Sequence, residues 1–313
     1  MSSRSQYTSV SRAAQGVGGN NNLGIYVVRH NRTNKTYIEK RVRPSAICQG
    51  DIQHEIQVMQ QCNGHPNIVS VMDYDLNYRS LRYGSVYMQH AELGSLDALI
   101  GRFAQRRSQR ADEGFAWKVL WDLSIGLAHL WTGQDARTVR QLASSGRSIT
   151  NVRDWNPVIH RDLKPSNIFM TWHDPLRIDT CPYPTMLIGD FGCAVTGDDI
   201  RNGRGMSNNL PVNDATFAPP EFPSFSEQGD VFSIGLIIVC IAYRSQVPPD
   251  GDPLQGNGAS EAMAIVLRKC MMRREKDRPS PHTLPTLVWW GYQKWCAGRS
   301  DSGRELPGWA FGD

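Results

Sequence analysis

The stretch VIHRDLKPSNIFM, from Val158 to Met170, sets a charged centre between two apolar ends. Apolar ends of this kind favour short buried strands, whereas the centre, HRDLKPSN at 160–167, holds four ionisable side chains and an amide. Such a pattern predicts a loop that leaves one strand and enters another. We expect its side chains to converge on a cleft rather than to disperse into solvent.

The composition of the whole chain narrows the classes of function. A chain of 313 residues is long enough for one large domain or for two lobes. It carries 34 Lys and Arg against 30 Asp and Glu, a net charge of +4 that is too small to indicate an obligatory nucleic-acid partner. A small ligand that bears phosphate would suit this charge equally well, and we expect no binding of nucleic acid.

Cysteine usage and hydropathy favour an intracellular protein, cytoplasmic or nuclear. The seven cysteines are an odd number without CxxC spacing, so neither a disulfide framework nor a zinc site is predicted. The longest apolar stretch, residues 234–243, is far shorter than the ~20 residues of a membrane-spanning helix. We therefore expect a buried helix there, no membrane segment and no signal peptide.

The pattern along the chain predicts an α+β fold in two lobes. Residues 1–22, rich in Ser, Gly, Asn and Gln, are expected to form a disordered tail. A small β-rich lobe with one main helix is expected at 23–90, and a larger, mainly helical lobe at 91–313. Two polar stretches of the larger lobe, at about 131–157 and 171–185, show little periodicity and are expected to be surface insertions.

The charged loop is one of several motifs that occur in a defined order. HRDLKPSN fits the H-R-D-L-x-x-x-N catalytic loop of protein kinases. Further kinase motifs are YIEK at 37–40, HPNIV at 65–69, VYMQHAELGSL at 86–96, GDFG at 189–192, APPE at 218–221, DVFSIG at 230–235 and RPS at 278–280. Across residues 23–295 the chain therefore resembles eukaryotic protein kinases of the Ser/Thr type, with the bilobal kinase fold, and more loosely the NIMA-related kinases. Each motif alone is weak evidence, so the ordered set carries the resemblance.

The resemblance implies a role for each catalytic residue in the transfer of a phosphoryl group from ATP. Lys40 would contact the α- and β-phosphates, and Glu55 on the following helix would hold Lys40 by an ion pair. Asp162 would accept or orient the proton of the substrate hydroxyl. Lys164, two residues later, would lie near the transferred phosphoryl group.

The same resemblance implies the binding residues for Mg²⁺ and for the adenine ring. Asn167 and Asp190 would hold Mg²⁺ through oxygen ligands, which this hard cation prefers. Met88 would be the gatekeeper, and the backbone of Ala91 would meet the adenine.

The glycine-rich loop departs from the family pattern G-x-G-x-x-G-x-V. In the segment GVGGNNNLGIYVV at 16–28, one register aligns the three glycine positions with Gly18, Asn20 and Leu23, and a shift by one residue aligns them with Gly19, Asn21 and Gly24. We expect Gly18, Gly19 and Ile25 to contact the nucleotide. Because a Cβ obstructs a close backbone approach to phosphate, the departure affects the expected nucleotide affinity more than the fold.

Three classes of function remain open. The first is transfer of the γ-phosphoryl group of Mg-ATP to Ser or Thr hydroxyls of protein substrates, for which Lys164 matches the Ser/Thr-directed loop. The alternative is a pseudokinase that binds partners, with weak or no nucleotide binding, and the third is a small-molecule phosphotransferase. Against the third class, the resemblance implies a pair between Glu221 of APPE and Arg278. It also implies that Arg161 faces a phosphorylated activation segment, where Ser207 is the candidate phosphosite.

Overall fold

The computed structural model describes residues 3–14, 22–106, 109–172, 181–203, 215–250, 258–297, 299 and 305–312. The chain divides into two compact units. The first holds residues 1–64 and 69–91, and the second holds residues 65–68 and 92–313. The predicted α+β class with two units is confirmed, and each unit is described by itself.

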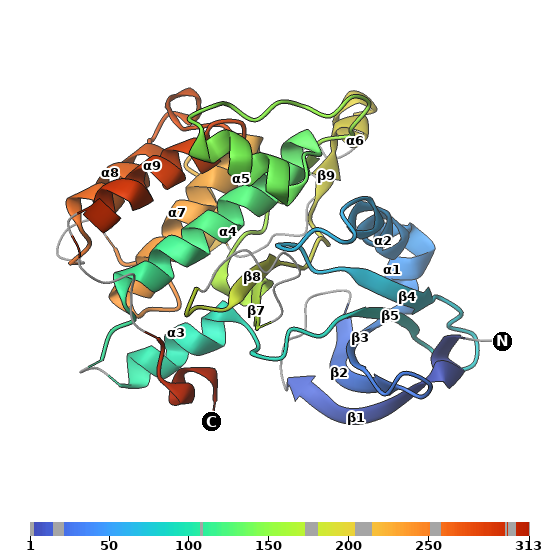
Figure 1. Ribbon diagram of the computed structural model, residues 1–313. Coiled ribbons are helices and arrows are strands. Elements are labelled where there is room, and N and C mark those ends of the chain that lie inside the picture. Colours follow the sequence, from blue (N-terminus) through green and yellow to red (C-terminus); the bar gives the residue numbers. More distant parts are fainter. Residues whose placement is uncertain are drawn as a thin grey trace. The chain divides into compact units, whose positions relative to one another are not determined.

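The first unit is built on an antiparallel sheet whose described strands follow the order β1-β2-β3-β5-β4 (Figure 1). Two helices, α1 and α2, lie between β3 and β4 in the chain. The elements are η1 (Ser3–Gln6), β1 (Tyr7–Ala14), β2 (Asn22–His30), β3 (Thr36–Val42), α1 (Pro44–Gln49), α2 (Asp51–Gln61), β4 (Val71–Asp75) and β5 (Gly84–Gln89).

The expected helix of the first unit forms in two pieces. Its predicted apolar face, Ile52, Ile56 and Met59, is buried on α2. The break comes at Gly50, whose φ of +86° is a left-handed conformation that ends α1 and begins α2.

The expectation of a disordered tail over residues 1–22 is wrong for residues 3–14, which form η1 and β1. Strand β1 pairs antiparallel with β2, and Tyr7 lies opposite His30. The ring of Tyr7 also stacks on Tyr87 of β5 with 3.9 Å between centroids. A short polar segment can therefore be held by backbone pairing and the aromatic contacts of one side chain, and a low content of large apolar residues does not exclude a strand.

The second unit contains the long helices and two short strand pairs among its described residues. In its described residues, β6 pairs with β9 and β7 with β8. The elements are α3 (Leu96–Gln105), α4 (Glu113–Thr132), α5 (Ala136–Ser144), β6 (Val158–Ile159), η2 (Pro165–Asn167), β7 (Ile168–Thr171), β8 (Thr185–Ile188), β9 (Val195–Thr196), α6 (Gly197–Arg201), η4 (Ala215–Phe217), α7 (Glu227–Tyr243), α8 (Glu261–Cys270), η5 (Glu275–Asp277), α9 (Leu284–Ala297) and η6 (Gly308–Phe311).

Helix α4 organises the second unit, because it packs against α5, α7, α9 and β8. The helices begin where the sequence supplies a side-chain acceptor for an unpaired N–H group at the first turn. The caps whose side chains accept such a bond are Ser95 for α3, Asp112 for α4, Asp135 for α5, Thr196 for α6, Ser226 for α7 and Ser260 for α8.

The expectation of a surface insertion at about 131–157 is wrong for its central part. Helix α5 lies there and packs against α4 and α9 (Figure 1). Ala136 and Val139 of α5 join a buried cluster with Ile125 and Ile149. In the second stretch, 171–185, β7 ends at Thr171 and β8 begins at Thr185, while residues 173–180 lie outside the described part.

None of the helices in the described ranges combines the length and the apolar character that a membrane crossing requires. No disulfide joins any two of the seven cysteines, all of which lie among the described residues.

Candidate active site

The first unit contributes a buried ion pair between β3 and α2. Nζ of Lys40 lies 2.7 Å from Oε1 of Glu55. Only 12% of the Lys40 side chain and 8% of the Glu55 side chain are exposed. Because water screens a pair this little exposed only weakly, the carboxylate holds the ammonium group of the flexible lysine in place. The pair that the resemblance implied is present.

Three expected nucleotide-contact residues lie on or next to the strands around Lys40. Ile25 on β2 is the direct cross-strand partner of Lys40. Met88 is half-buried near the end of β5, the strand that pairs with β3. Ala91 follows β5 and is 8% exposed. Ile25 and Met88 thus lie on strands of the sheet that carries Lys40, and Ala91 lies just beyond it, while their contact with a nucleotide stays a prediction.

Other residues singled out in the sequence lie outside the described part of the chain. They are Gly18, Gly19 and Ser207. The glycine-rich loop and the activation-segment phosphosite therefore stay predictions.

The second unit contains the charged loop, and the loop lies between two strands as predicted. Strand β6 ends at Ile159, and β7 begins at Ile168 after the single turn η2. Both strands pair with the segment that carries GDFG, because β7 pairs with β8 before this motif and β6 pairs with β9 after it. The two motifs are thereby brought together by backbone pairing.

Asp162 accepts hydrogen bonds from two residues of its own loop. Nζ of Lys164 donates to Oδ1 over 3.0 Å, and Nδ2 of Asn167 donates to Oδ2 over 2.9 Å. Nδ2 of Asn167 also donates to the Asp162 carbonyl over 2.8 Å, which closes the loop on itself. Burial raises the pKa of Asp162, although the charge of Lys164 opposes the rise. The carboxylate is therefore a stronger base than an exposed aspartate.

Asn167 and Asp190 provide oxygen donors suited to a hard cation. The N–H of Gly189 donates to the Asn167 carbonyl over 2.9 Å, which ties the residue before Asp190 to the loop. The amide nitrogen of Asn167 is committed to Asp162, so its oxygen is the group left for a cation. Asp190 is exposed and adds a carboxylate. An amide oxygen and a carboxylate are ligands that Mg²⁺ takes in proteins, so the donor set fits this ion.

A fully buried carboxylate, to which no role was assigned from the sequence, binds the backbone of the charged loop. Oδ2 of Asp230, on α7, accepts from the backbone N–H of His160 over 2.7 Å. Oδ1 of the same residue accepts from the N–H of Arg161 over 2.9 Å. A signal for this residue existed, because Asp230 is the first residue of the matched motif DVFSIG at 230–235.

The basic residues of the second unit make specific contacts as well. Nε of Arg161 donates to the carbonyl of Cys193 over 2.7 Å, just beyond GDFG. Arg278, whose side chain is fully buried, makes a two-pronged pair with Glu221 at 2.6 and 2.7 Å. The Glu221–Arg278 pair that the resemblance implied is thereby confirmed.

Comparisons with known proteins agree with this geometry. Residues 15–290 match the family model described as protein kinase domain. The mitosis inhibitor protein kinase SWE1 of Saccharomyces cerevisiae is 22% identical over 245 residues, which are 73% of this chain and 24% of that protein. The G2-specific protein kinase fin1 of Schizosaccharomyces pombe is 24% identical over 279 residues, which are 83% of this chain and 36% of that protein. The dual specificity mitogen-activated protein kinase kinase dSOR1 of Drosophila melanogaster is 27% identical over 239 residues, which are 74% of this chain and 48% of that protein.

The chain thus spans less than half the length of each of these relatives. The family match, in contrast, covers both units and every motif from Lys40 to Arg278. The chain therefore belongs to the eukaryotic protein kinase superfamily.

Proposed function

We propose that the chain is an active protein kinase that transfers the γ-phosphoryl group of Mg-ATP to Ser or Thr hydroxyls of protein substrates. The observation that carries this proposal is the environment of Asp162. Its buried carboxylate has a raised pKa and is oriented by Lys164 and Asn167. A largely buried carboxylate with a raised pKa and two side-chain donors is an arrangement common among catalytic acids and bases.

Each residue would have a defined part in the reaction. Asp162 would orient the substrate hydroxyl and take up its proton as the new O–P bond forms. Lys164 would neutralise charge on the transferred group, and Lys40, held by Glu55, would bind the phosphates that remain on the nucleotide. Mg²⁺, held by Asn167 and Asp190, would neutralise charge on the phosphate oxygens.

The preference for Ser and Thr rests on Lys164, which lies two residues after Asp162 and contacts its carboxylate over 3.0 Å. The names of the relatives do not decide between the possible acceptor hydroxyls, since the name of dSOR1 states dual specificity. Phosphoamino-acid analysis of the labelled product would separate Ser and Thr from Tyr. The looser likeness to NIMA-related kinases stays a prediction.

The activity is tested by transfer of radiolabelled phosphate from ATP to the chain itself and to a general acceptor such as casein. Asp162→Asn is expected to lower the rate about 10²- to 10⁴-fold, the usual share of a general base. Lys40→Met should abolish transfer as well. Matched controls are Asp154→Asn, at a side chain that is 89% exposed, and Lys35→Met, in the exposed turn between β2 and β3. If Asp162→Asn keeps the wild-type rate, the proposal is wrong.

The alternative function is a pseudokinase that binds partners, and the departure of the glycine-rich loop from the family pattern favours it. Thermal unfolding with ATP separates the two proposals. A nucleotide at about 100 times its Kd stabilises the folded state by about 2.7 kcal/mol, so an active kinase should unfold at a higher temperature with ATP and Mg²⁺. A pseudokinase without nucleotide binding would show no shift and would label no acceptor.

The small-molecule phosphotransferase is the weakest of the three proposals. The buried pair of Glu221 and Arg278 ties the end of the activation segment to the helical part of the second unit, as a platform for protein substrates would need. Labelling of an amino sugar or a choline-like compound in place of casein would reverse this ranking.

A further inference from the structure

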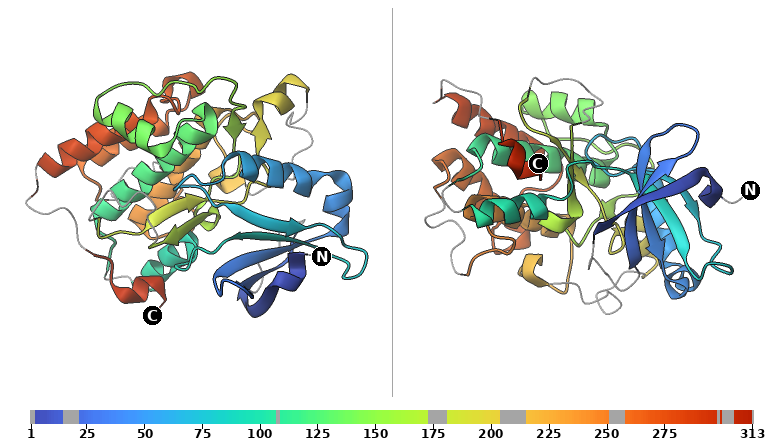
Figure 2. Two further views of the ribbon diagram at one scale, coloured as in Figure 1. Left: turned by 45° about the vertical axis from the view of Figure 1, so that its right-hand side comes forward. Right: turned by 90° about the horizontal axis from the view of Figure 1, so that it is seen from below.

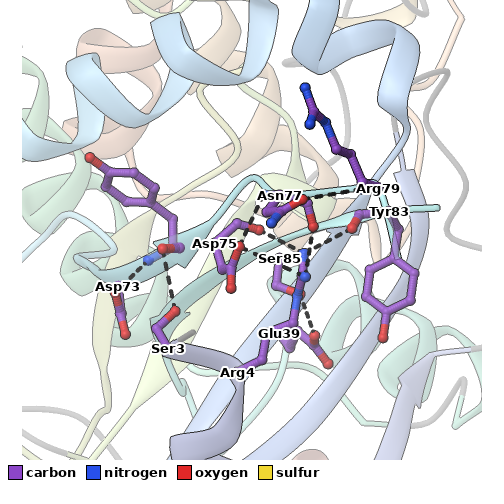
Figure 3. A network of polar contacts seen from close by, with 10 residues as sticks. Ser3, Arg4, Glu39, Asp73, Asp75, Asn77, Arg79, Tyr83 and Ser85 are labelled. Atoms are coloured by element: carbon purple, nitrogen blue, oxygen red, sulfur yellow. Dashed lines mark hydrogen bonds and ion pairs between the residues drawn. The ribbon is translucent and has the colours of Figure 1, made fainter. Parts of the chain in front are cut away.

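The outer face of the sheet in the first unit holds a buried arginine. Glu39 and Lys40 follow one another on β3, so their side chains point to opposite faces of the sheet. Lys40 points towards α2, whereas Glu39 lies on the face that η1 approaches (Figure 3). On that face the side chain of Arg4 is only 14% exposed.

The guanidinium group of Arg4 is surrounded by acceptors. Nη1 donates to the carbonyl of Asn77 over 2.8 Å, and Nε donates to Oγ of Ser85 over 3.1 Å. Nη2 donates to the carbonyls of Asp75 and Tyr83, each over 2.8 Å. Three backbone carbonyls and a hydroxyl thus converge on one planar cation, as Figure 3 shows. This fan of acceptors matches the fixed fork of a guanidinium group, which a lysine ammonium cannot reproduce.

The segment that supplies the carbonyls is shaped by its own side chains. Oδ1 of Asp75 accepts from the N–H of Asn77 over 3.0 Å, and Oδ1 of Asn77 accepts from the N–H of Arg79 over 3.2 Å. These bonds do not involve Arg4. The carboxylate of Asp75 also lies 3.7 Å from Nη1 of Arg4 and supplies negative charge to the site. The turn between β4 and β5 is therefore a formed receptor that a guanidinium group can enter.

The receptor connects to the strand that carries Lys40. Oγ of Ser85 donates to Oε1 of Glu39 over 2.7 Å, and Nε of Arg41 donates to Oε2 of Glu39 over 3.1 Å. Ser85 is fully buried and Glu39 is 4% exposed. Glu39 and Arg41 flank Lys40 on β3. A chain of three hydrogen bonds thus runs from Arg4 to the two neighbours of Lys40.

We propose that this face carries an arginine-binding site, that Arg4 fills it in cis, and that filling it positions β3 and with it Lys40. Arg4 is a positioning residue, because it contacts the strand of Lys40 through Ser85 and Glu39. Without the guanidinium group, the converging carbonyls lose their donor next to a buried carboxylate, and β3 and β5 open more readily. Only the last step, from the position of Lys40 to catalysis, rests on the proposed function.

Hydrogen exchange with chemical rescue tests the site without any need for kinase activity. In Arg4→Ala the amides of β3 and β5 should exchange about tenfold faster, since the hydrogen bonds from a charged group to both strands' surroundings are lost. Ethylguanidinium, which fits the vacated site, should restore slow exchange, whereas equal concentrations of ethylammonium or sodium chloride should not. In Arg4→Lys the amides of β3 and β5 should exchange nearly as fast as in Arg4→Ala. In Arg12→Ala, at an exposed arginine of β1, the strand that follows η1, the amides should exchange as in wild type with and without ethylguanidinium.

The positioning step has its own readout. Acetylation of Lys40 by an amine-reactive ester, quantified by mass spectrometry, should accelerate in Arg4→Ala and slow again with ethylguanidinium. Unchanged exchange in Arg4→Ala, or exchange that ethylguanidinium does not slow, would overturn the arginine site. Restored exchange with no change in Lys40 acetylation would overturn the positioning role. A protein without phosphoryl transfer would still give all these readouts, so the two proposals fail separately.

Discussion

Two residues of the catalytic segments have a backbone conformation that only glycine adopts without cost. Arg161 has a φ of 67° and Asp190 a φ of 61°. A non-glycine residue in this region costs of order 1–3 kcal/mol, so other contacts must stabilise it. For Arg161 one such contact is the hydrogen bond that its N–H donates to Asp230. Asp230 thus stabilises the backbone conformation of the residue directly before Asp162.

This support leads to a prediction for Asp230→Asn. An asparagine keeps one acceptor oxygen, so either the N–H of His160 or that of Arg161 loses its partner. Loss of one buried partner costs about 1–3 kcal/mol, and we expect that loss in the free energy of unfolding together with a slower single-turnover rate. Urea unfolding and rapid-quench kinetics would measure the two effects. Asp154→Asn, at an exposed carboxylate, is the control, and equal stability of the two variants would contradict the role of Asp230.

A second prediction concerns the pH dependence of stability at Asp162. Burial raises the pKa of this carboxyl above its unfolded value, so the folded state binds the proton more tightly than the unfolded state. The contribution of Asp162 to stability is therefore full below the unfolded pKa, about 3.9, and is lost as the pH rises through the folded pKa. Asp162→Asn removes this loss while it keeps one acceptor oxygen. Relative to wild type, the melting temperature of the variant should rise between pH 4 and pH 7, and a relative fall would contradict the sign.

At the scale of elements, two pieces were mispredicted for a shared reason. Helix α5 buries only small or short side chains, Ala136, Val139 and Ala143, among arginines and glutamine. Strand β1 is held by pairing with β2 and by Tyr7. In both elements the partner supplies most of the packing, so the segment's own apolar pattern is faint. A local signal did exist for α5, since Asp135 is an N-cap residue type directly before the helix.

The cap itself gives the third prediction. Oδ1 of Asp135 accepts from the N–H groups of Arg137 and Thr138 over 2.9 and 3.0 Å. Burial alone would raise the pKa of Asp135, but hydrogen bonds led by those from Thr138 outweigh it and lower that pKa. Asp135→Ala should cost about 0.5–2 kcal/mol of stability at neutral pH, measured by urea unfolding.

Because the folded pKa of Asp135 is depressed, its contribution is present above the unfolded pKa and is lost as the pH falls through the folded one. The difference between Asp135→Ala and wild type should therefore shrink in acid. Asp135→Ser, which keeps a capping oxygen, should retain most of the stability. A constant difference at all pH values would show that the cap acts through something other than its carboxylate.

At the scale of the whole molecule, contiguous motifs were predictable and long-range support was not. The loop at 160–167 and the GDFG motif each lie within a few residues of sequence, so their identity and order could be read directly. Asp230 is about seventy positions away from the backbone groups that it binds, and Arg4 about eighty from Ser85. Such contacts depend on how the elements fold back on one another, which local patterns do not encode. Arg4 is part of no matched motif, and Asp230, although it begins the matched motif DVFSIG, carries nothing in its local sequence that names its distant partners.

A contact between two residues that lie still farther apart in the sequence gives the last prediction. Nη1 of Arg102 on α3 donates to the carbonyl of Ala310 over 3.0 Å, across 208 positions of the chain. Beside it the ring of Trp309 lies 4.8 Å from that of Phe103 and 4.3 Å from the guanidinium carbon of Arg106. Figure 2 shows η6 next to α3 in both views. Because Trp309 is partly exposed, Trp309→Ala should cost about 1–3 kcal/mol, less than the 3–5 kcal/mol of a fully buried aromatic residue.

The effect of Trp309→Ala should be local. Hydrogen exchange of α3 should accelerate, because η6 covers Phe103 and its loss lets this helix open without the rest of the second unit. Exchange of α4 and α7, which pack deeper, should stay as in wild type. Trp290→Ala is the matched control, since Trp290 is 41% exposed on α9 and contacts Lys294 of the same helix. If hydrogen exchange of α3 is as slow in both tryptophan variants as in wild type, then η6 contacts α3 without stabilising it.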